Sequence, residues 1–379
     1  MSVVTEPVTS TAVRTRFRVQ RSTALTRIGT AALFVAIALF AALPEWGDPG
    51  LMHTMVQLFA LLALAQMWNL LAGYAGLISI GQQVYVGLGS YALFVFANNH
   101  EMDLWVSVAL AGLAAFLLSF PIAAIAFRLR GGYFAIGTWV IAEAVFLLVV
   151  NEDSVGGGSG TTLTAVSQYD IDVRQRVTYW IALGVAVASI LIVMLILRSR
   201  LGLALRATRD NETASGGLGV SVLQSKVIVY VVAALVTGLV GAVILLNDIR
   251  VQPDSAFSVA KWTAPIIFIV VIGGIGTVEG PILGTLIYYL LQENLADFEE
   301  WYLIILGAAA VGLMIVAPRG LWGSVAHRWN IRLLGAPRLL RVPGDGEGKP
   351  DDGSSAERGP AAPPPAPVLA RTSDDGDDP

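Results

Sequence analysis

The sequence predicts an all-α, polytopic integral membrane protein with about ten transmembrane helices and both termini in the cytoplasm. The composition is strongly apolar, with 55% hydrophobic residues and a mean hydropathy of +0.68. Apolar runs recur along the whole chain, several of them near the ~20 residues that a helix needs to cross the hydrocarbon of a bilayer. The distribution of Lys and Arg between these runs then predicts the orientation of the chain.

The first apolar run follows an arginine-rich N-terminal tail, residues 1–27. We expect this run to be a retained signal anchor, because the candidate cleavage site at Ala36 and Ala38 lies inside it and many more spans follow. The run at 281–292 is too short to cross alone and is expected to be a tilted or half helix. The ten runs lie at about 28–43, 51–72, 82–97, 104–127, 132–150, 178–197, 222–247, 262–277, 281–292 and 301–317.

Charge supports this count of spans. Ten spans that start from a cytoplasmic N-terminus place 17 Lys and Arg residues inside and four outside. Acidic pairs such as Glu101/Asp103 and Glu152/Asp153 fall outside. The positive-inside rule is therefore obeyed. We expect a multi-pass protein of the cell inner membrane, with a transmembrane domain at 28–342 and a disordered, proline-rich cytoplasmic tail at 343–379.

Composition also excludes several classes of site. The chain has no cysteine, which removes disulfides and thiolate chemistry. Its three histidines, His53, His100 and His327, are far apart and predict no metal site. No P-loop pattern occurs, so we expect no bound nucleotide, no other cofactor and no catalytic residue. A membrane enzyme is disfavoured because no His/Asp/Ser or metal constellation is spaced for chemistry. No nucleic-acid partner is expected.

The central loop, 198–226, is the most basic internal segment. Residues 201–209 favour a helix. Asp210 and Asn211 can cap a second helix, which should stop near the glycines at 216–219. Ser221 and Gln224 have the spacing of a capping box for the next span. The loop is either a docking surface for a partner or a solvated connector.

Two glycine-rich breaks interrupt the apolar pattern. The first carries no charge, so it need not leave the membrane, where non-helical backbone is tolerated only against protein or a water-filled path. Close packing of helices through small residues is the alternative explanation. The first break contains Asn69, Gly73, Tyr74, Gly76, Ser79 and Gln82, and the second contains Gly273, Gly274, Gly276, Thr277, Gly280 and Pro281.

A third block runs from Arg130 through Tyr133 and Thr138 to Glu143, the one ionisable residue well inside a predicted span. A carboxylate costs roughly 2.5–3.5 kcal/mol there, so it should face a partner or a wet cavity. One interpretation is a residue of the substrate path. The other is a hydrogen bond, or a protonated carboxyl, that ties this helix to Asn69, Gln82 or Thr138.

These motifs resemble one family. The loop pattern Arg206, Ala207, Arg209, Glu212, Ala214 and Gly219 is similar to the cytoplasmic coupling loop of ATP-binding-cassette importer permeases. The two glycine breaks and the Tyr133–Glu143 block resemble the branched-chain amino acid importer family, in its M-type permease subunit. Ser215-Gly216-Gly217, Gly132 and Trp139 depart from the family pattern. The first departure predicts a short or loose coupling helix.

The resemblance implies a permease subunit that carries branched-chain or other small apolar amino acids and works with partners. These are a second homologous permease subunit, two ATPase subunits that bind the ATP, and an extracytoplasmic substrate-binding protein. It also implies that the coupling loop docks on an ATPase and that the two glycine breaks and Tyr133, Thr138 and Glu143 are candidates for the translocation path. Two alternatives stay open: a related permease for urea or short amides, and an ion-coupled secondary transporter, for which one intramembrane carboxylate is thin support.

Overall fold

The computed structural model describes residues 18–20, 24–46, 48–295, 301–317, 320–329 and 339–341. The chain divides into two compact units. The smaller comprises Met1–Gln20 and Arg338–Pro379, and in it strand β1 (Arg18–Gln20) pairs antiparallel with β4 (Leu339–Arg341). The predicted disordered tail at 343–379, and most of the N-terminal tail, lie outside the described residues. The larger unit, Arg21–Pro337, holds the helices.

The larger unit confirms the all-α prediction. Its only described sheet is a two-residue pairing of β2 with β3. Three segments of π-helix extend or precede longer helices: η2 (Leu70–Tyr74), η3 (Val95–Asn99) and η7 (Val259–Thr263). The α-helices are α1 (Ala24–Ala42), α2 (Pro49–Asn69), α3 (Gln83–Phe94), α4 (Leu104–Ala126), α5 (Gly132–Val150), α6 (Ile171–Arg198), α7 (Arg200–Asp210), α8 (Glu212–Gly217), α9 (Val222–Asp248), α10 (Pro253–Ala256), α11 (Ala264–Gly273), α12 (Glu279–Leu295), α13 (Trp301–Val316) and α14 (Gly320–Trp329).

Short elements make up the connections. They are η1 (Leu43–Glu45), η4 (Asp153–Val155), η5 (Gly157–Ser159), β2 (Thr161–Thr162), η6 (Thr164–Gln168) and β3 (Arg250–Val251). Each of the ten predicted apolar runs coincides with helix. Six described helical segments are long and apolar enough to cross a bilayer: 49–74, 104–126, 132–150, 171–198, 222–248 and 253–273. The chain is therefore a polytopic membrane protein.

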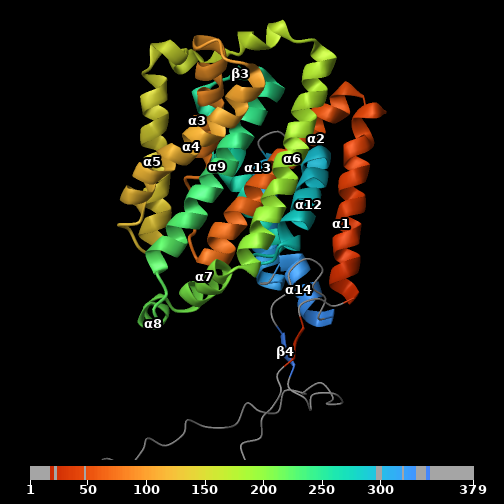
Figure 1. Cartoon of the computed structure of the whole chain (residues 1–379), viewed down its shortest axis with the longest axis vertical. Coiled ribbons are helices and arrows are strands. Elements are labelled where there is room, and N and C mark those ends of the chain that lie inside the picture. Colours follow the sequence, from red (N-terminus) through yellow and green to blue (C-terminus); the bar gives the residue numbers. More distant parts are fainter. Residues whose placement is uncertain are drawn as a thin grey trace, which may run out of the picture. The chain divides into compact units, whose positions relative to one another are not determined.

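Helix α9 is the centre of the bundle and packs against α2, α3, α4 and α6. Glycine permits this close approach: a Cβ at Gly241 would lie 2.1 Å from the Val86 carbonyl oxygen, and one at Gly89 would lie 2.0 Å from the Gly238 carbonyl oxygen. Small residues at such contacts let membrane helices pack backbone to backbone. Helix α5 lies at the edge of the bundle (Figure 1), and only 17% of its apolar window is buried, against 72% for α9.

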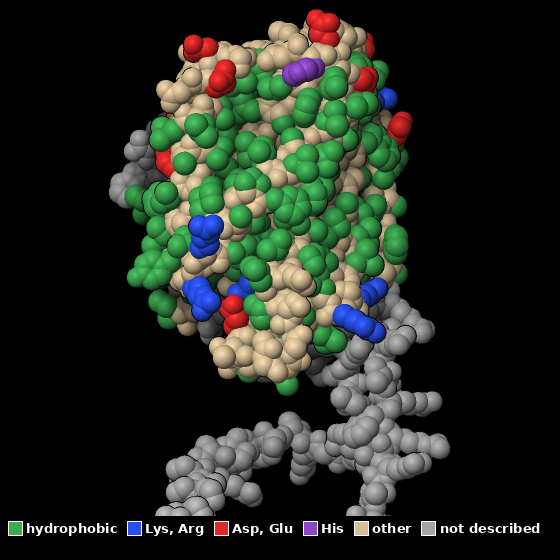
Figure 2. Space-filling model, turned by 60° about the vertical axis from the view of Figure 1, so that its left-hand side comes forward, with side chains coloured by type: hydrophobic (Ala, Val, Ile, Leu, Met, Phe, Trp, Pro, Cys, Tyr) green, Lys and Arg blue, Asp and Glu red, His purple; other side chains and the backbone are tan. Residues whose placement is uncertain are grey.

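The two ends of the bundle differ in charge. Helices α7 and α8 lie at one end, and β3 lies at the other (Figure 1). Lys and Arg gather on the α7 end in Figure 2, whereas Asp and Glu gather on the opposite end. We call these the basic end and the acidic end. The sequence predicts this segregation, because it places Lys and Arg on the cytoplasmic side of each span.

Candidate functional site

The central loop folds into a helical hairpin, as the sequence predicts. Ser199 caps α7 by accepting a hydrogen bond from the Leu201 amide at 3.1 Å. Asn211 caps α8 by accepting one from the Ala214 amide at 2.9 Å. The predicted capping box is wrong, because the Ser221 side chain makes no capping hydrogen bond at the start of α9. Its backbone, with φ −74° and ψ 81°, departs from the extended conformation usual at that position.

Helix α8 has only six residues, which agrees with the short coupling helix expected from Ser215-Gly216-Gly217. Ser215 is buried, while the neighbours on both sides are exposed. Leu218 is 85% exposed. Gly219 follows in a left-handed conformation, with φ +83°, and turns the chain toward α9. The hairpin therefore presents an exposed tip that contains Glu212, Ala214 and Gly219.

One ion pair fastens this tip to the bundle. The Lys226 ammonium of α9 lies 2.7 Å from a Glu212 carboxylate oxygen. The Lys226 side chain is 13% exposed and that of Glu212 is 56% exposed. Exposed pairs contribute about 0–1 kcal/mol, so the pair orients α8 more than it stabilises the protein.

The two arginines of the coupling pattern differ in their contacts. Arg209 donates a hydrogen bond to the carbonyl oxygen of Gly73, in the last turn of η2. A cation suits the end of a helix, where carbonyl groups lack intrahelical partners. Arg206 is exposed and makes no hydrogen bond or ion pair within the described part of the chain. Arg209 therefore holds the hairpin to the first glycine break, and Arg206 is free for a partner.

The two glycine breaks lie against each other. The Asn69 side-chain oxygen accepts from the Gly276 amide at 2.8 Å, and its nitrogen donates to the Thr277 carbonyl at 2.7 Å. A Cβ at Gly73 would lie 2.7 Å from the Gly276 nitrogen. Gly76 and Gly276 have φ of +70° and +77°, which favour glycine. We call this contact, with Arg209 bonded to it, the glycine junction.

The second break has internal supports of its own. The Thr277 hydroxyl donates to the Gly274 carbonyl at 2.7 Å and accepts from the Gly280 amide at 3.0 Å. A Cβ at Gly273 would lie 1.9 Å from the Gly280 carbonyl oxygen. From α2, Gln66 donates to the Val278 carbonyl at 2.8 Å. Side chains of the protein thus satisfy the Gly274 and Val278 carbonyls and the Gly280 amide, as a segment at membrane depth requires.

The remaining residues of the first break follow the same principle. Trp68 donates to the Ser79 carbonyl at 2.9 Å. The Thr138 hydroxyl accepts from the Ile80 amide at 3.2 Å, and Gln82 donates to the Thr237 hydroxyl at 3.0 Å. Tyr74, Ser79, Gln82 and Thr138 are all buried. The Gln82 side-chain oxygen has no hydrogen-bond partner in the described part of the chain, and Gln82 lines a cavity of about 10 Å³.

Two predicted path residues lie apart from these. Tyr133 is 75% exposed, and Glu143 is exposed on the same face of α5. The inner face of α5 is formed by Phe134, Thr138 and Ala142. The alternative in which Glu143 bonds to Asn69, Gln82 or Thr138 is not seen in the described residues, because Glu143 is exposed on α5 while Thr138 lies on the buried face of that helix.

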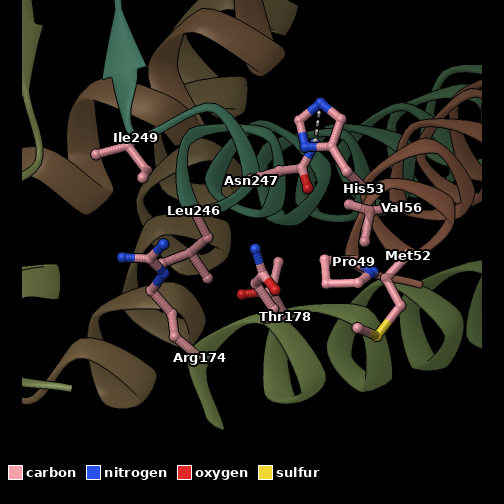
Figure 3. Close-up of a pocket in the computed structure, with 10 residues that line it drawn as sticks. Pro49, Met52, His53, Val56, Arg174, Thr178, Leu246, Asn247 and Ile249 are labelled. Atoms are coloured by element: carbon pink, nitrogen blue, oxygen red, sulfur yellow. Dashed lines mark hydrogen bonds between the residues drawn. The ribbon is translucent and has the colours of Figure 1, made fainter. Parts of the chain in front are cut away.

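The acidic end carries two pockets that sequence reasoning missed. Figure 3 shows the smaller, of about 100 Å³, between α2, α6 and α9. His53 lies there beside Asn247, whose side-chain nitrogen is 3.5 Å away, and Arg174 lies across the pocket. The larger pocket, of about 380 Å³, lies between α2, α9, η7 and α12. Neither has a sequence signal, because each is lined by residues of helices that are far apart in the chain.

Known proteins identify the family. The family model described as the permease component of the branched-chain amino acid transport system matches residues 51–317. The chain belongs to this family. It is 30% identical, over 71% of its length and 68% of the relative, to the high-affinity branched-chain amino acid transport system permease protein LivM of Salmonella typhimurium. It is 29% identical, over the same shares, to the LivM protein of Escherichia coli.

A more distant relative is the probable branched-chain amino acid transport permease protein LivM of Methanocaldococcus jannaschii, 26% identical over 54% of this chain and 61% of the relative. No solved structure matches the chain. The matched span, 51–317, contains the α7–α8 hairpin, both glycine breaks and α5. The family resemblance of the motifs is therefore confirmed, and the chain is a multi-pass permease component of the cell inner membrane.

Proposed function

We propose that this chain is a permease subunit that imports branched-chain amino acids with energy from partner ATPases. The observation that carries the proposal is the Arg209 hydrogen bond to Gly73. An ATPase that displaced α8 would act on α7, and α7 is bonded to the junction where both glycine breaks meet. A movement of the hairpin would thus be transmitted to the buried backbone of the glycine junction through α7 and Arg209, without an intervening flexible linker.

The exposed tip of the hairpin is the proposed docking surface for one ATPase subunit. Arg206 on α7 is unpaired within the described residues, and Leu218 is exposed at the end of α8. A cation and an apolar side chain on a short helical projection suit a groove with an acidic rim. The second ATPase would bind the homologous loop of a second permease subunit, so that ATP is bound by the partners and not by this chain.

The outer face of α5 is the proposed contact with that second permease. Tyr133, Ile136, Val140 and Leu147 are exposed there at 52–75%, together with Glu143. A carboxyl in the middle of a span is costly against lipid, so a partner that supplies a hydrogen bond or a wet cavity favours this face over the bilayer. Glu143 would then line the path between the two permeases.

The proposed topology has ten spans and two cytoplasmic termini. The segregation of charge between the two ends supports it (Figure 2). Reporter fusions after Asn99, Gly160 and Asp297 should read outside, and fusions after Arg130, Thr213 and Arg341 should read inside. A cytoplasmic reading at Gly160 would overturn the ten-span arrangement.

The substrate is tested most simply on the binding protein that delivers it. Calorimetry of that partner with leucine, valine, polar amino acids, urea and short amides should give submillimolar binding for the branched-chain amino acids. Submillimolar binding of urea, with no heat from any amino acid, would contradict the proposed substrate and leave the family assignment intact.

A further inference from the structure

The larger pocket of the acidic end has two kinds of lining. Apolar side chains of α2 and α9, Leu58, Leu61 and Ile244, contribute one kind. The rest of the lining is charged or polar and includes Lys261, Asp248 and Glu293. Its volume of about 380 Å³ lies in the range of small-molecule sites, roughly 300–1,000 Å³.

Lys261 is held in place, and it has no anionic partner among the residues that the structure describes. Its ammonium donates to the Ser255 hydroxyl at 2.8 Å and lies 5.1 Å from the centre of the Trp262 ring. Trp262 is itself fixed, because its indole nitrogen donates to the Ser255 carbonyl at 2.9 Å. An ammonium has three donors, so Lys261 keeps donors for a ligand.

The two carboxylates of the pocket are also free of ion pairs. Asp248 accepts from the Asn247 side chain at 3.3 Å, and within the described residues neither Asp248 nor Glu293 is ion-paired. One cation and two anions thus line a single cavity without neutralising one another. Asp248 is half-buried, whereas Lys261 and Glu293 are exposed. Charges of opposite sign around one cavity complement a ligand that carries both signs.

We propose that this pocket is a binding site for the α-amino acid substrate at the acidic end of the permease. The inference rests on the proposed function and specifies where the substrate first binds this chain. Lys261 would bind the carboxylate, Asp248 and Glu293 would bind the ammonium, and Leu58, Leu61 and Ile244 would contact the branched side chain. The apolar lining excludes a second charged group, which separates leucine from lysine or glutamate.

The test uses photo-leucine, a diazirine analogue of leucine, on the complete importer in nanodiscs with its binding protein. Illumination followed by peptide mass spectrometry should place the label on α2, α9 or η7, at residues of the pocket, and excess leucine should prevent it. The variant Lys261→Met keeps the length of the side chain and removes its charge. It should lower the labelling roughly tenfold, as expected for the loss of one charge-assisted hydrogen bond.

The matched control is Arg250→Met. Arg250 is exposed at the same end, donates to the Ser159 carbonyl at 3.4 Å and does not line the pocket. Its labelling should equal that of the wild type. Co-purification of all subunits with each variant verifies folding. Equal labelling of Lys261→Met and wild type, label elsewhere only, or competition by phospholipid but not by leucine would overturn the site.

Uptake of leucine by the same preparation separates the two claims. Wild-type uptake with label outside the pocket would reject the pocket and retain the proposed function. Absence of uptake of every branched-chain amino acid would reject the proposed function as well.

Discussion

Arg209 of α7 donates its hydrogen bond to the carbonyl of Gly73, which lies 136 residues earlier in the chain. Arg206, one helical turn away, makes no such contact within the described residues. Two arginines that look alike in the sequence thus differ in their contacts. Arg209 ties the hairpin to the glycine junction, and Arg206 is available to a partner.

Removing Arg209 should therefore lower stability, and removing Arg206 should not. Arg209→Met leaves the Gly73 carbonyl without its charged donor, which we expect to cost about 1–2 kcal/mol. Arg206→Met should be neutral within about 0.5 kcal/mol, as an exposed residue without partners. Thermal unfolding of the purified permease in detergent measures both. Equal melting temperatures for the two variants would show that the Arg209 contact contributes nothing.

Charge reversal at the same positions tests coupling. Arg206→Glu should leave the permease folded and lower the substrate-stimulated ATP hydrolysis of the complex, because like charges would then face each other at the docking surface. Reversal of Arg206 and Arg209 together should abolish the stimulation. Stimulated hydrolysis at the wild-type rate in the double variant would mean that the hairpin is only a connector.

Gly73→Ala should disrupt the glycine junction. The added methyl would lie 2.3 Å from the Asn69 side-chain oxygen and 2.7 Å from the Gly276 nitrogen. Such overpacking costs typically 1–3 kcal/mol. Gly216→Ala in α8 is the control, since its methyl would meet nothing within 4 Å. This control should match or exceed wild-type stability by up to about 1 kcal/mol. A tolerated Gly73→Ala would mean that the two breaks do not pack closely.

Asn69→Leu should destabilise the junction by leaving the Gly276 amide and the Thr277 carbonyl unsatisfied. Each buried orphan costs about 1–3 kcal/mol. Asn151→Leu is the control: Asn151 is exposed at the end of α5, and among the described residues its side chain donates only to the Leu147 carbonyl. Denaturation of the two variants by heat or by a harsh detergent should rank Asn69→Leu as the weaker. The reverse ranking would exclude Asn69 as the bridge.

The outer loops should respond to acid through Asp103. Amide donation from Val106 and the Tyr169 hydroxyl bond, 3.0 Å long, hold the pKa of Asp103 below its usual value. A carboxyl with a depressed folded pKa stabilises the protein above its unfolded pKa of about 3.9, and this contribution is lost as the pH falls through the folded pKa. Tyr169→Phe should reduce that acid dependence in melting curves between pH 2 and about 6. Identical pH profiles for variant and wild type would exclude the contact as a source of acid sensitivity.

The sequence predicts the helices well, because apolar runs of spanning length and the charges between them are local signals. It also predicts the short α8, since Gly216 and Gly217 weaken a helix wherever they lie. The capping box at Ser221 fails because a spacing does not determine the backbone angles that capping needs. All three predictions, right or wrong, rest on residues that are close together in the sequence.

Long-range contacts have no such signal. Asn69 and Gly276 are 207 residues apart, and their hydrogen bond joins a side chain to the backbone. No sequence pattern predicts such a bond. The sequence likewise did not predict that Glu143 lies on the exposed face of α5. Helix α5 is apolar on almost every face, so its sequence has no periodicity that separates an inner face from an outer one. The pocket around Lys261 could not be predicted either, because residues of α2, α9, η7 and α12 that are far apart in the chain line it together.

The central claim is that this chain passes branched-chain amino acids only when partner ATPases drive it. Uptake of labelled leucine into proteoliposomes tests this most directly, with the purified chain alone compared with the complete set of two permeases, two ATPases and binding protein. Accumulation is expected only for the complete set, with ATP on the ATPase side. Leucine accumulation by the chain alone, driven by a proton or sodium gradient without ATP, would contradict the account.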